Sequence, residues 1–388
     1  MVKTGLDKFV EESGKYRKRS IALIANQTSV VHDLEYSWNV LKREGIVIKR
    51  IFSPEHGIFS TEQDQVAVEH QPDIGIEIVS LYGDSDSSIV PDEEFLKDID
   101  LVIFDIQDVG SRYYTYLNMI PFFMKAIEHT GIEMMILDRP NPLGGLRVEG
   151  PLLDVEFSSF VGIYPVTVRH GLTPAELAFL YKDMRKIDIE LSVKRMEGWR
   201  RSMLYDETGL QWIPPSPNMP TTDTAMVYAG SCLFEGINVS EGRGTTTPFQ
   251  IMGAPFIQSD SLADRLNRYD LPGVFFRPVY FKPCFNEYSE EMIGGIFIHV
   301  TDSVEFHSFL TGVAVVKTIY DLYPDRVVFK KGVYEFNTAH PAFDLLTGSS
   351  VIREMIISGA SLDEIFSLWQ KDEKEFLEIK REYHLYGD

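Results

Sequence analysis

The sequence is poor in cysteine and in basic residues, and it contains no long apolar run. Cys232 and Cys284 are the only cysteines in 388 residues, too few for a disulfide framework or a thiolate zinc site. No apolar stretch reaches the roughly 18 residues that a membrane span needs, so none is predicted. Lysine and arginine number 37 against 58 acidic residues, a formal net charge of −21. This charge disfavours nucleic acid and anionic membrane surfaces as partners.

Several catalytic motifs are also absent, and each absence excludes a class of enzyme. The sequence has no G-x-G-x-x-G, no G-x-x-x-x-G-K-[ST], no H-E-x-x-H and no G-x-S-x-G. Its nine histidines lack H-x-H and H-x-x-x-H spacing, so a zinc enzyme is not expected. The pair Asp84 and Asp86 offers hard oxygen ligands, but a D-x-D in a serine-rich loop is usually only solvated. We therefore expect no metal ion and no cofactor.

The first twenty residues carry acids early and contain no apolar core segment. This pattern does not match a secretory signal, so the chain as given is expected to be cytoplasmic. An exported form, whose signal has been removed from this sequence, stays open.

Short apolar segments alternate with segments of helical periodicity in the first half of the chain. Strands are predicted at residues 20–25, 46–52, 76–81, 101–106 and 134–137. Helices are predicted near residues 34–41 and 117–129. Largely apolar strands separated by helices indicate an α/β fold with a parallel sheet covered on both faces.

The second half differs in composition and in the spacing of its predicted strands and helices. Capping boxes at residues 173–176 and 361–364 predict two helix starts. Further strands are predicted at 189–193 and 294–300, and a long helix at 304–323. The change of composition near residues 145–165 predicts a domain boundary there, between an α/β domain over 1–155 and a second domain over 156–388.

Polar clusters follow four of the predicted strands. They are Asn26 with Gln27, Glu55 with His56, residues 105–108 and residues 138–141. The carboxyl ends of parallel strands meet at one edge of the sheet, which is where open α/β sheets bind ligands. The sequence therefore predicts an active-site cleft at that edge.

The segment Ser-Pro-Glu-His-Gly at residues 53–57 is the sharpest of these clusters. Proline ends the strand, glycine permits a tight turn, and Glu55 and His56 are presented between them. Glu55 is predicted to act as a general acid, with His56 orienting it. The structural alternative is a surface glutamate beside a histidine that caps a helix.

Residues 105–116 combine two acids, an arginine and three tyrosines. Tyrosine rings stack on the C–H faces of sugars, and charged groups bond to their hydroxyls. Asp105, Asp108, Arg112, Tyr113 and Tyr116 are therefore candidate contacts to a sugar. In the structural alternative, Asp108 is a helix N-cap and Arg112 is its ion-pair partner.

The loop at residues 138–142 carries Asp138, Arg139 and Asn141 between two prolines, which would fix their poses. Glu235, Glu241 and Arg243 lie in a later glycine-rich loop. For these later acids a salt bridge is at least as good an interpretation as a substrate contact.

Together these segments resemble one protein family. The motifs SPEHG, FDIQDVGSRYYTY, LDRPNPLGG with EGP, HGLTPAE, PSPNMP and FEGINVSEGRGTTTPF occur in this order. They are similar to those of the bacterial exo-β-N-acetylmuramidase (NamZ-like) family, formerly a domain of unknown function. The resemblance covers nearly the whole chain. It implies a Rossmann-like N-terminal domain, a smaller C-terminal α+β domain and an active site in the cleft between them.

The resemblance also implies an activity, the release of N-acetylmuramic acid from the non-reducing end of peptidoglycan fragments. Glu55 matches the glutamate of the SPEHG turn and is expected to be the leading catalytic carboxylate. Asp108 or Glu241 is the expected second carboxylate. Many members of the family are exported, whereas this chain shows no signal, so recycling of imported muropeptides is one expected role.

The substrate itself suggests further contacts. Its lactyl carboxylate needs a cation, and Arg112, Arg139 and Arg243 are the candidates, Arg139 ranked first for its rigid loop. Other expected substrate contacts are Asn26, Asp105, Tyr113, Tyr116, Asp138, Asn141 and Glu235. Two other functions stay open: a carbohydrate-binding protein without turnover, and a transferase on an α/β sheet. The sequence sets neither the stereochemical outcome nor the oligomeric state.

Overall fold

The computed structural model describes residues 1–63, 66, 68, 71–81 and 90–388. The Asp84 and Asp86 pair lies outside the described residues. Within the described part, no helix is long and apolar enough to cross a bilayer.

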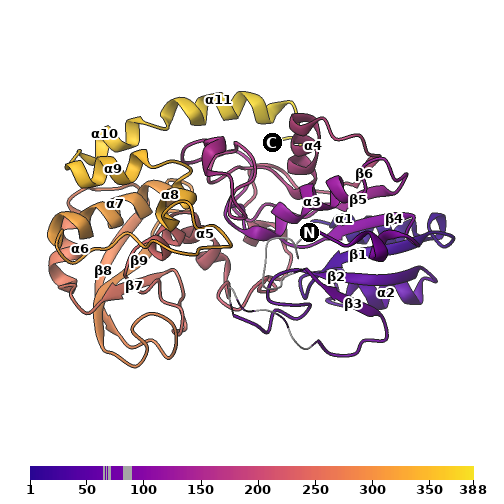
Figure 1. Ribbon diagram of the computed structural model, residues 1–388, viewed down its shortest axis with the longest axis horizontal. Helices are drawn as coiled ribbons and strands as arrows, with labels where there is room; N and C mark the ends of the chain where they lie inside the picture. The colour runs from indigo at the N-terminus through magenta and orange to yellow at the C-terminus, as the bar shows by residue number, and fades with distance from the viewer. Residues whose placement is uncertain (64–65, 67, 69–70, 82–89) are drawn as a thin grey trace.

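The first half of the chain is built on a six-stranded parallel sheet (Figure 1). Its strands are β1 (Ser20–Ala25), β2 (Val47–Ser53), β3 (Glu77–Ser80), β4 (Leu101–Asp105), β5 (Glu133–Leu137) and β6 (Leu191–Lys194). They lie in the order β3-β2-β1-β4-β5-β6, and every neighbouring pair is parallel. This is the strand order of a Rossmann fold, so the predicted fold class is confirmed.

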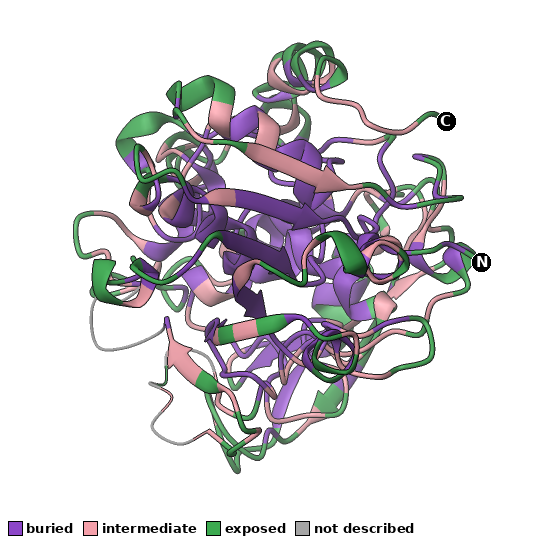
Figure 2. Cartoon of the chain, turned by 90° about the vertical axis from the view of Figure 1, so that its right-hand side faces the viewer, coloured by how far each residue is buried: buried purple, intermediate pink, exposed green. Residues whose placement is uncertain are grey.

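The two faces of this sheet are covered by different helices because side chains alternate along each strand. Ile21 and Leu23 of β1 pack with α1 (Gly5–Glu11) and α2 (Ser37–Arg43). Ala22 and Ile24 belong to the core on the other face, with α3 (Met119–Ala126) and α4 (Pro174–Arg185). Strand β4 is buried from end to end and β1 at all but its first residue, whereas β3 and β6 at the edges are partly exposed (Figure 2).

The second half contains a smaller antiparallel sheet in the order β7-β9-β8. Its strands are β7 (Ile251–Ala254), β8 (Val274–Phe281) and β9 (Ile293–Val300). The surrounding helices are α5 (Thr222–Ser231), α6 (Ser259–Asn267), α7 (Ser308–Leu322), α8 (Ala342–Thr347), α9 (Val351–Ser358), α10 (Leu362–Ser367) and α11 (Gln370–Arg381). Helices α5 and α7 approach closely at two glycines, since a Cβ on Gly312 would meet the carbonyl oxygen of Gly230 at 2.1 Å.

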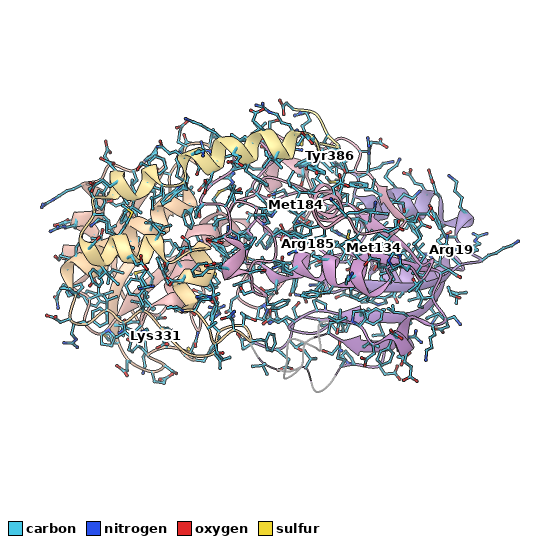
Figure 3. All side chains as sticks on the ribbon, turned by 45° about the horizontal axis from the view of Figure 1, so that its top comes forward. Arg19, Met134, Met184, Arg185, Lys331 and Tyr386 are labelled. Atoms are coloured by element: carbon cyan, nitrogen blue, oxygen red, sulfur yellow. The ribbon has the colours of Figure 1, made fainter. Side chains whose placement is uncertain are left out.

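The C-terminal helix α11 runs over the top of the molecule from the second half to the first (Figure 1). Beyond it, the hydroxyl of Tyr386 donates to Asp138 at 2.6 Å, and Figure 3 shows Tyr386 past the end of this helix. The ammonium group of Lys380 donates to the carbonyls of Gly145 and Gly171. The chain end therefore ties the two halves together.

Strand β6 joins the first sheet although it lies beyond residue 155. The long loops before it account for the change of composition at residues 145–165. The parallel sheet thus takes in residues on both sides of the predicted boundary, and the division into 1–155 and 156–388 stays a prediction. Strand β8 was not predicted. It contains Pro278 and lies at an edge of its sheet, where a missing N–H is tolerated.

Candidate active site

A pocket lies beyond the carboxyl edge of the first sheet, where loops from both halves meet. About 550 Å³ of space not filled by protein atoms, part of it open to solvent, lies between side chains from the turn after β2, the segment after β4, the 216–219 loop and the second half. Its lining residues are Glu55, His56, Tyr113, Tyr114, Thr115, Tyr116, Val161, Ser216, Asn218, Met219, Tyr228, Glu235, Arg243, Phe249, Tyr334 and Glu335. Of the residues predicted from sequence, it brings together Glu55, His56, Tyr113, Tyr116, Glu235 and Arg243.

Glu55 reaches the pocket from a sharp turn directly after β2. His56 has a φ of 69° and Gly57 a φ of 82°, so two successive residues adopt the left-handed conformation. Such a conformation is disfavoured for a residue with a side chain and is frequent at functional sites. The imidazole Nδ1 of His56 lies 2.8 Å from the carbonyl oxygen of Glu62, which fixes the ring. The Glu55 carboxylate is buried and accepts a hydrogen bond from Thr115 Oγ1 at 3.1 Å.

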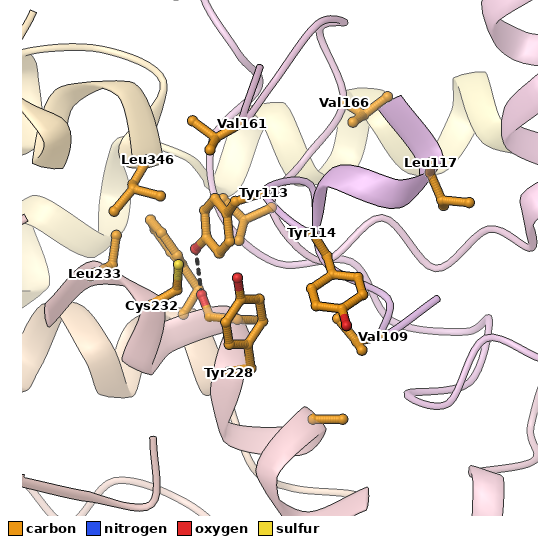
Figure 4. Packing of buried hydrophobic residues seen from close by; sticks show 14 of the residues in the cluster. Val109, Tyr113, Tyr114, Leu117, Val161, Val166, Tyr228, Cys232, Leu233 and Leu346 are labelled. Carbon is orange, nitrogen blue, oxygen red and sulfur yellow. Dashed lines mark hydrogen bonds between the residues drawn. The ribbon is translucent and has the colours of Figure 1, made fainter. Parts of the chain in front are cut away.

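Tyrosines form one wall of the pocket. Tyr114 makes edge contacts with Tyr116 and Tyr228, with ring centroids 4.8 and 5.8 Å apart. The hydroxyl of Tyr113 donates to the carbonyl of Ala229, as Figure 4 shows beside Tyr228. Burial raises the pKa of Tyr113, Tyr114 and Tyr228 well above the ordinary value, so these phenols are neutral.

The proline-rich loop that precedes α5 is fastened to the sheet edge through one carbonyl. The oxygen of Pro215 accepts hydrogen bonds from Asn26 Nδ2 at 3.3 Å, Ser60 Oγ at 2.8 Å and the Tyr116 hydroxyl at 2.8 Å. These bonds place Ser216 and Asn218 on the pocket wall. The predicted contact residue Asn26 therefore holds the loop, and it is not part of the lining.

The second half contributes an acid and base cluster. Arg243 lies 2.9 Å from both Glu235 and Glu241, and its guanidinium stacks over the Phe249 ring at 4.9 Å. The hydroxyl of Tyr334 donates to the other oxygen of Glu235 at 2.6 Å. Glu235 is thus held on both carboxylate oxygens at the pocket wall.

Comparison with known proteins agrees with this geometry. Residues 21–223 match the family model for the N-terminal part of exo-beta-N-acetylmuramidase NamZ, and residues 226–386 match the model for its C-terminal part. The chain belongs to the NamZ family. It is 40% identical over 389 aligned residues to the peptidoglycan beta-N-acetylmuramidase NamZ of Bacillus subtilis strain 168, covering 99% of this chain and 91% of that protein.

Two crystal structures of DUF1343 family proteins from Bacteroides fragilis NCTC 9343 are also similar to this NamZ family member. One has a TM-score of 0.90 at 34% identity and covers 99% of both chains. The other has a TM-score of 0.76 at 29% identity, covering 100% of this chain and 99% of that one. The resemblance proposed from the sequence motifs is confirmed, and so is the fold that it implies.

The two residues predicted as alternatives for the second carboxylate lie outside the lining of this NamZ pocket. Asp108 Oδ2 accepts from the N–H of Gly110 at 2.7 Å and lies 3.4 Å from Nε2 of His170. Glu241 Oε1 accepts from Asn286 at 2.9 Å and from Arg243. The structural alternative for Asp108 is not seen either, because Asp108 caps a turn and no helix, and its neighbour is His170, whereas Arg112 bonds to carbonyls elsewhere.

Two of the predicted arginines are held inside the protein. The guanidinium of Arg112 donates to the carbonyls of Pro151, Val166 and Leu346 at 2.8–2.9 Å. Arg139 forms an ion pair with Asp105 at 2.7 Å, and both side chains are buried. Burial raises the pKa of Asp105 to about 6 although Arg139 opposes the shift.

Asp138 and Asn141 serve the loop that starts α4. Asp138 accepts from Thr173 Oγ1 at 2.8 Å and from the N–H of Ala175 at 3.0 Å, in addition to Tyr386. Burial raises the pKa of Asp138 to about 7, against the lowering effect of these donors. Asn141 donates to the carbonyl of Leu172 at 2.9 Å.

Sequence reasoning did not single out Thr115, Ser216, Asn218, Tyr228, Tyr334 and Glu335, all of which line the pocket. Thr115 stands within the YYTY segment, and Ser216 and Asn218 within the PSPNMP motif, so the family motifs held a signal for these three. Tyr334 and Glu335 belong to no quoted motif. Among the described residues, no group of three His, Cys, Asp or Glu side chains is arranged to hold a metal ion.

Proposed function

We propose that this chain releases N-acetylmuramic acid from the non-reducing end of peptidoglycan fragments, with Glu55 as the general acid. The observation that carries the proposal is the buried Glu55 carboxylate, held in a left-handed turn on the pocket wall and hydrogen-bonded to Thr115. A general acid must be fixed within reach of the leaving oxygen, and a turn at the sheet edge fixes it. Membership of the NamZ family supports the same glycosidase activity.

Glycosidases generally need a second carboxylate opposite the acid. We assign this role to Glu235, because it lines the same pocket and accepts hydrogen bonds from Arg243 and Tyr334 on its two oxygens. A carboxylate that already accepts charge-assisted bonds is suited to stabilise the positive charge of an oxocarbenium-like transition state or to attack it. Asp108 and Glu241 are less suitable because neither lines the pocket, and one oxygen of each is bonded to neighbouring groups.

The lactyl carboxylate of muramic acid would contact Arg243. Among the described lining residues it is the one arginine, whereas Arg112 and Arg139 are bonded inside the protein. Glu235 and Glu241 already share the Arg243 guanidinium, so its attraction for a third carboxylate is reduced. The tyrosine wall offers ring faces and edges for the apolar side of the sugar.

The substrate class that this proposal names is a saccharide or muropeptide derived from peptidoglycan. A cytoplasmic location, with recycling of imported fragments as the role, is part of the proposal.

The test is incubation with a chromogenic β-glycoside of N-acetylmuramic acid and, in parallel, its N-acetylglucosamine counterpart. The proposal predicts release of the chromophore from the muramic acid glycoside and a clear preference for it. A protein that binds the muramic sugar without releasing product would instead support the carbohydrate-binding alternative. Transfer of the sugar to an added acceptor, with no hydrolysis, would support a transferase.

A further inference from the structure

A two-residue hairpin turn from the second half reaches into the pocket. Tyr334 and Asn337 exchange both backbone hydrogen bonds, each at 2.9 Å, and Glu335 and Phe336 form the tip between them. Their φ angles are 44° and 65°, so both tip residues are left-handed. Turns of this kind normally carry Asn-Gly or a similar pair, because a Cβ is disfavoured in this conformation.

Contacts on both sides hold this unfavourable turn in place. The ring of Phe336 lies 6.1 Å from the ring of Phe160, which together with Phe122 forms a small apolar cluster on the first half of the chain. On the other side, the Tyr334 hydroxyl is bonded to Glu235 on the pocket wall. Left-handed residues also occur away from the pocket, Glu290 among them, so the strain at Glu335 and Phe336 matters because their turn lies at the pocket.

These contacts hold Glu335 at the pocket. Its side chain lines the pocket, and the residue is 9% exposed. Glu335 is the third glutamate in the described lining, after Glu55 and Glu235, whereas Arg243 is the one arginine there. Gathering carboxylates in a buried pocket costs free energy, so each is expected to have a use. A sugar supplies hydroxyl donors, which carboxylate oxygens accept well.

We propose that Glu335 binds the terminal sugar by accepting a hydrogen bond from one of its hydroxyls, and that the strained 334–337 turn exists to place this carboxylate. The inference rests on the proposed function, since it takes the sugar to be N-acetylmuramic acid. The 3-oxygen of that sugar carries the lactyl group, so at a non-reducing end the free hydroxyls are those at C4 and C6. Glu335 contacts one of these two.

The first experiment measures kcat and KM of Glu335→Ala and Glu335→Gln on the chromogenic muramic acid glycoside. Loss of a hydrogen bond to a charged group predicts a kcat/KM about 10- to 150-fold lower for Glu335→Ala, expressed mainly in KM. Glu335→Gln keeps one acceptor oxygen and should lie between this variant and the wild type. Glu290→Gln is the matched control, because Glu290 is an exposed glutamate with a φ of 63° that lies outside the pocket lining. It should behave as the wild type does.

A second variant separates the carboxylate from the stability of the turn. Glu335→Asn combined with Phe336→Gly gives the sequence that this turn type prefers, without a carboxylate. It should fold and show the same loss as Glu335→Ala. Full activity in this double variant would overturn the proposal.

Substrates deoxygenated at C4 or at C6 identify the contact directly. For one of the two deoxy substrates, kcat/KM of the wild type should fall about as much as kcat/KM of Glu335→Ala falls on the normal substrate. On that same deoxy substrate, kcat/KM of Glu335→Ala should be little lower than on the normal substrate. If, for both deoxy substrates, the loss from the substitution and the loss from the missing hydroxyl simply multiply, Glu335 does not contact a free hydroxyl.

Binding of free N-acetylmuramic acid, followed by titration calorimetry, tests Glu335 without turnover. The inference predicts weaker binding to Glu335→Ala than to the wild type or Glu290→Gln. If the wild type binds the sugar but hydrolyses no glycoside, the proposed function fails while this inference stands. If Glu335→Ala stays within roughly threefold of wild type in both binding and kcat/KM, below the range for a charged hydrogen bond, the inference is wrong.

Discussion

The hydroxyl of Thr115 donates a hydrogen bond to Oε2 of Glu55 at 3.1 Å. Thr115 comes from the 3₁₀ turn after β4, at residues Thr115–Asn118, and Glu55 comes from the turn after β2. The bond therefore joins the loops that follow β2 and β4, the strands on either side of β1, and it limits how Glu55 is oriented toward the pocket.

Thr115→Val should lower kcat by roughly 2- to 12-fold, the range expected for one net hydrogen bond. Valine keeps the shape of the side chain but leaves Glu55 less well oriented. Thr130→Val is the control, since the Thr130 hydroxyl bonds to the carbonyl of Ile127 at a helix end outside the pocket lining. Steady-state kinetics on the chromogenic glycoside measures both variants, and equal kcat values for the two would show that the Thr115 bond has no catalytic role.

Arg243→Ala should reduce the preference for the muramic acid glycoside over the glucosamine glycoside. A contact to a charged group is worth roughly 10- to 150-fold, and the sharing of Arg243 between Glu235 and Glu241 places the expected loss at about 10-fold. The loss should appear as slower turnover of the muramic substrate. Arg277→Ala, an exposed arginine beside His299, is the control. An unchanged ratio of kcat/KM for the two glycosides would exclude Arg243 as the partner of the lactyl carboxylate.

Asp138 should make the stability of the protein depend on pH. Burial raises the pKa of Asp138 from 3.8 to about 7 in the folded protein. Because the folded state holds the Asp138 proton more tightly than the unfolded state does, protonation of Asp138 stabilises the folded protein. This contribution is fully present below about pH 4 and is lost as the pH rises through about 7. The difference of roughly three pKa units corresponds to at most about 4 kcal/mol.

The measurement compares urea unfolding of the wild type and Asp138→Asn at several pH values between 4 and 8. The free energy of unfolding of the wild type should fall, relative to that of the variant, as the pH rises through this window. Asp105, whose pKa burial raises to about 6, titrates in both proteins and cancels in the comparison. Parallel pH profiles for the two proteins would show that Asp138 is ionised throughout.

The position of the strand ends was well predicted from the sequence, because buried parallel strands are continuous apolar runs. Residues 20–25 and 101–106 were expected as strands, and β1 and β4 occupy Ser20–Ala25 and Leu101–Asp105. The SPEHG turn then follows a strand, and its proline and glycine mark the sharp bend that places Glu55 on the pocket wall. This local chemistry is visible in the sequence.

The hydrogen-bond and ion-pair partners of the polar side chains could not be predicted from the sequence in the same way. Arg139 and Asp138 lie at the sheet edge as expected, yet their groups bond to Asp105, Thr173 and Tyr386. A strand-end position does not tell whether a side chain points to the cleft or to another loop. Glu335 was missed because its turn has no glycine and becomes left-handed through contacts with residues far away in sequence, such as Phe160.

Strong chelators should leave the activity unchanged. The pocket contains His56 and three glutamates, but no three such side chains among the described residues are arranged to hold a metal ion. Carboxylate acid–base chemistry needs no metal. Dialysis against EDTA followed by the glycoside assay tests this expectation. Activity that is lost on dialysis and restored by a divalent ion would contradict it, and Asp84, Asp86, Asp105 and Asp108 would then have to be considered as ligands.

The most direct test of the account is the turnover rate of Glu55→Gln on the chromogenic muramic acid glycoside. The amide preserves the shape of the side chain and accepts the Thr115 bond, but it cannot donate a proton, so folding should be intact. General acid catalysis contributes about 10²–10⁴-fold, and the rate should fall by at least that much, while the exposed-site control Glu354→Gln keeps the wild-type rate. A Glu55→Gln variant that retains more than roughly a tenth of the wild-type rate would contradict the assignment of Glu55 as the catalytic acid.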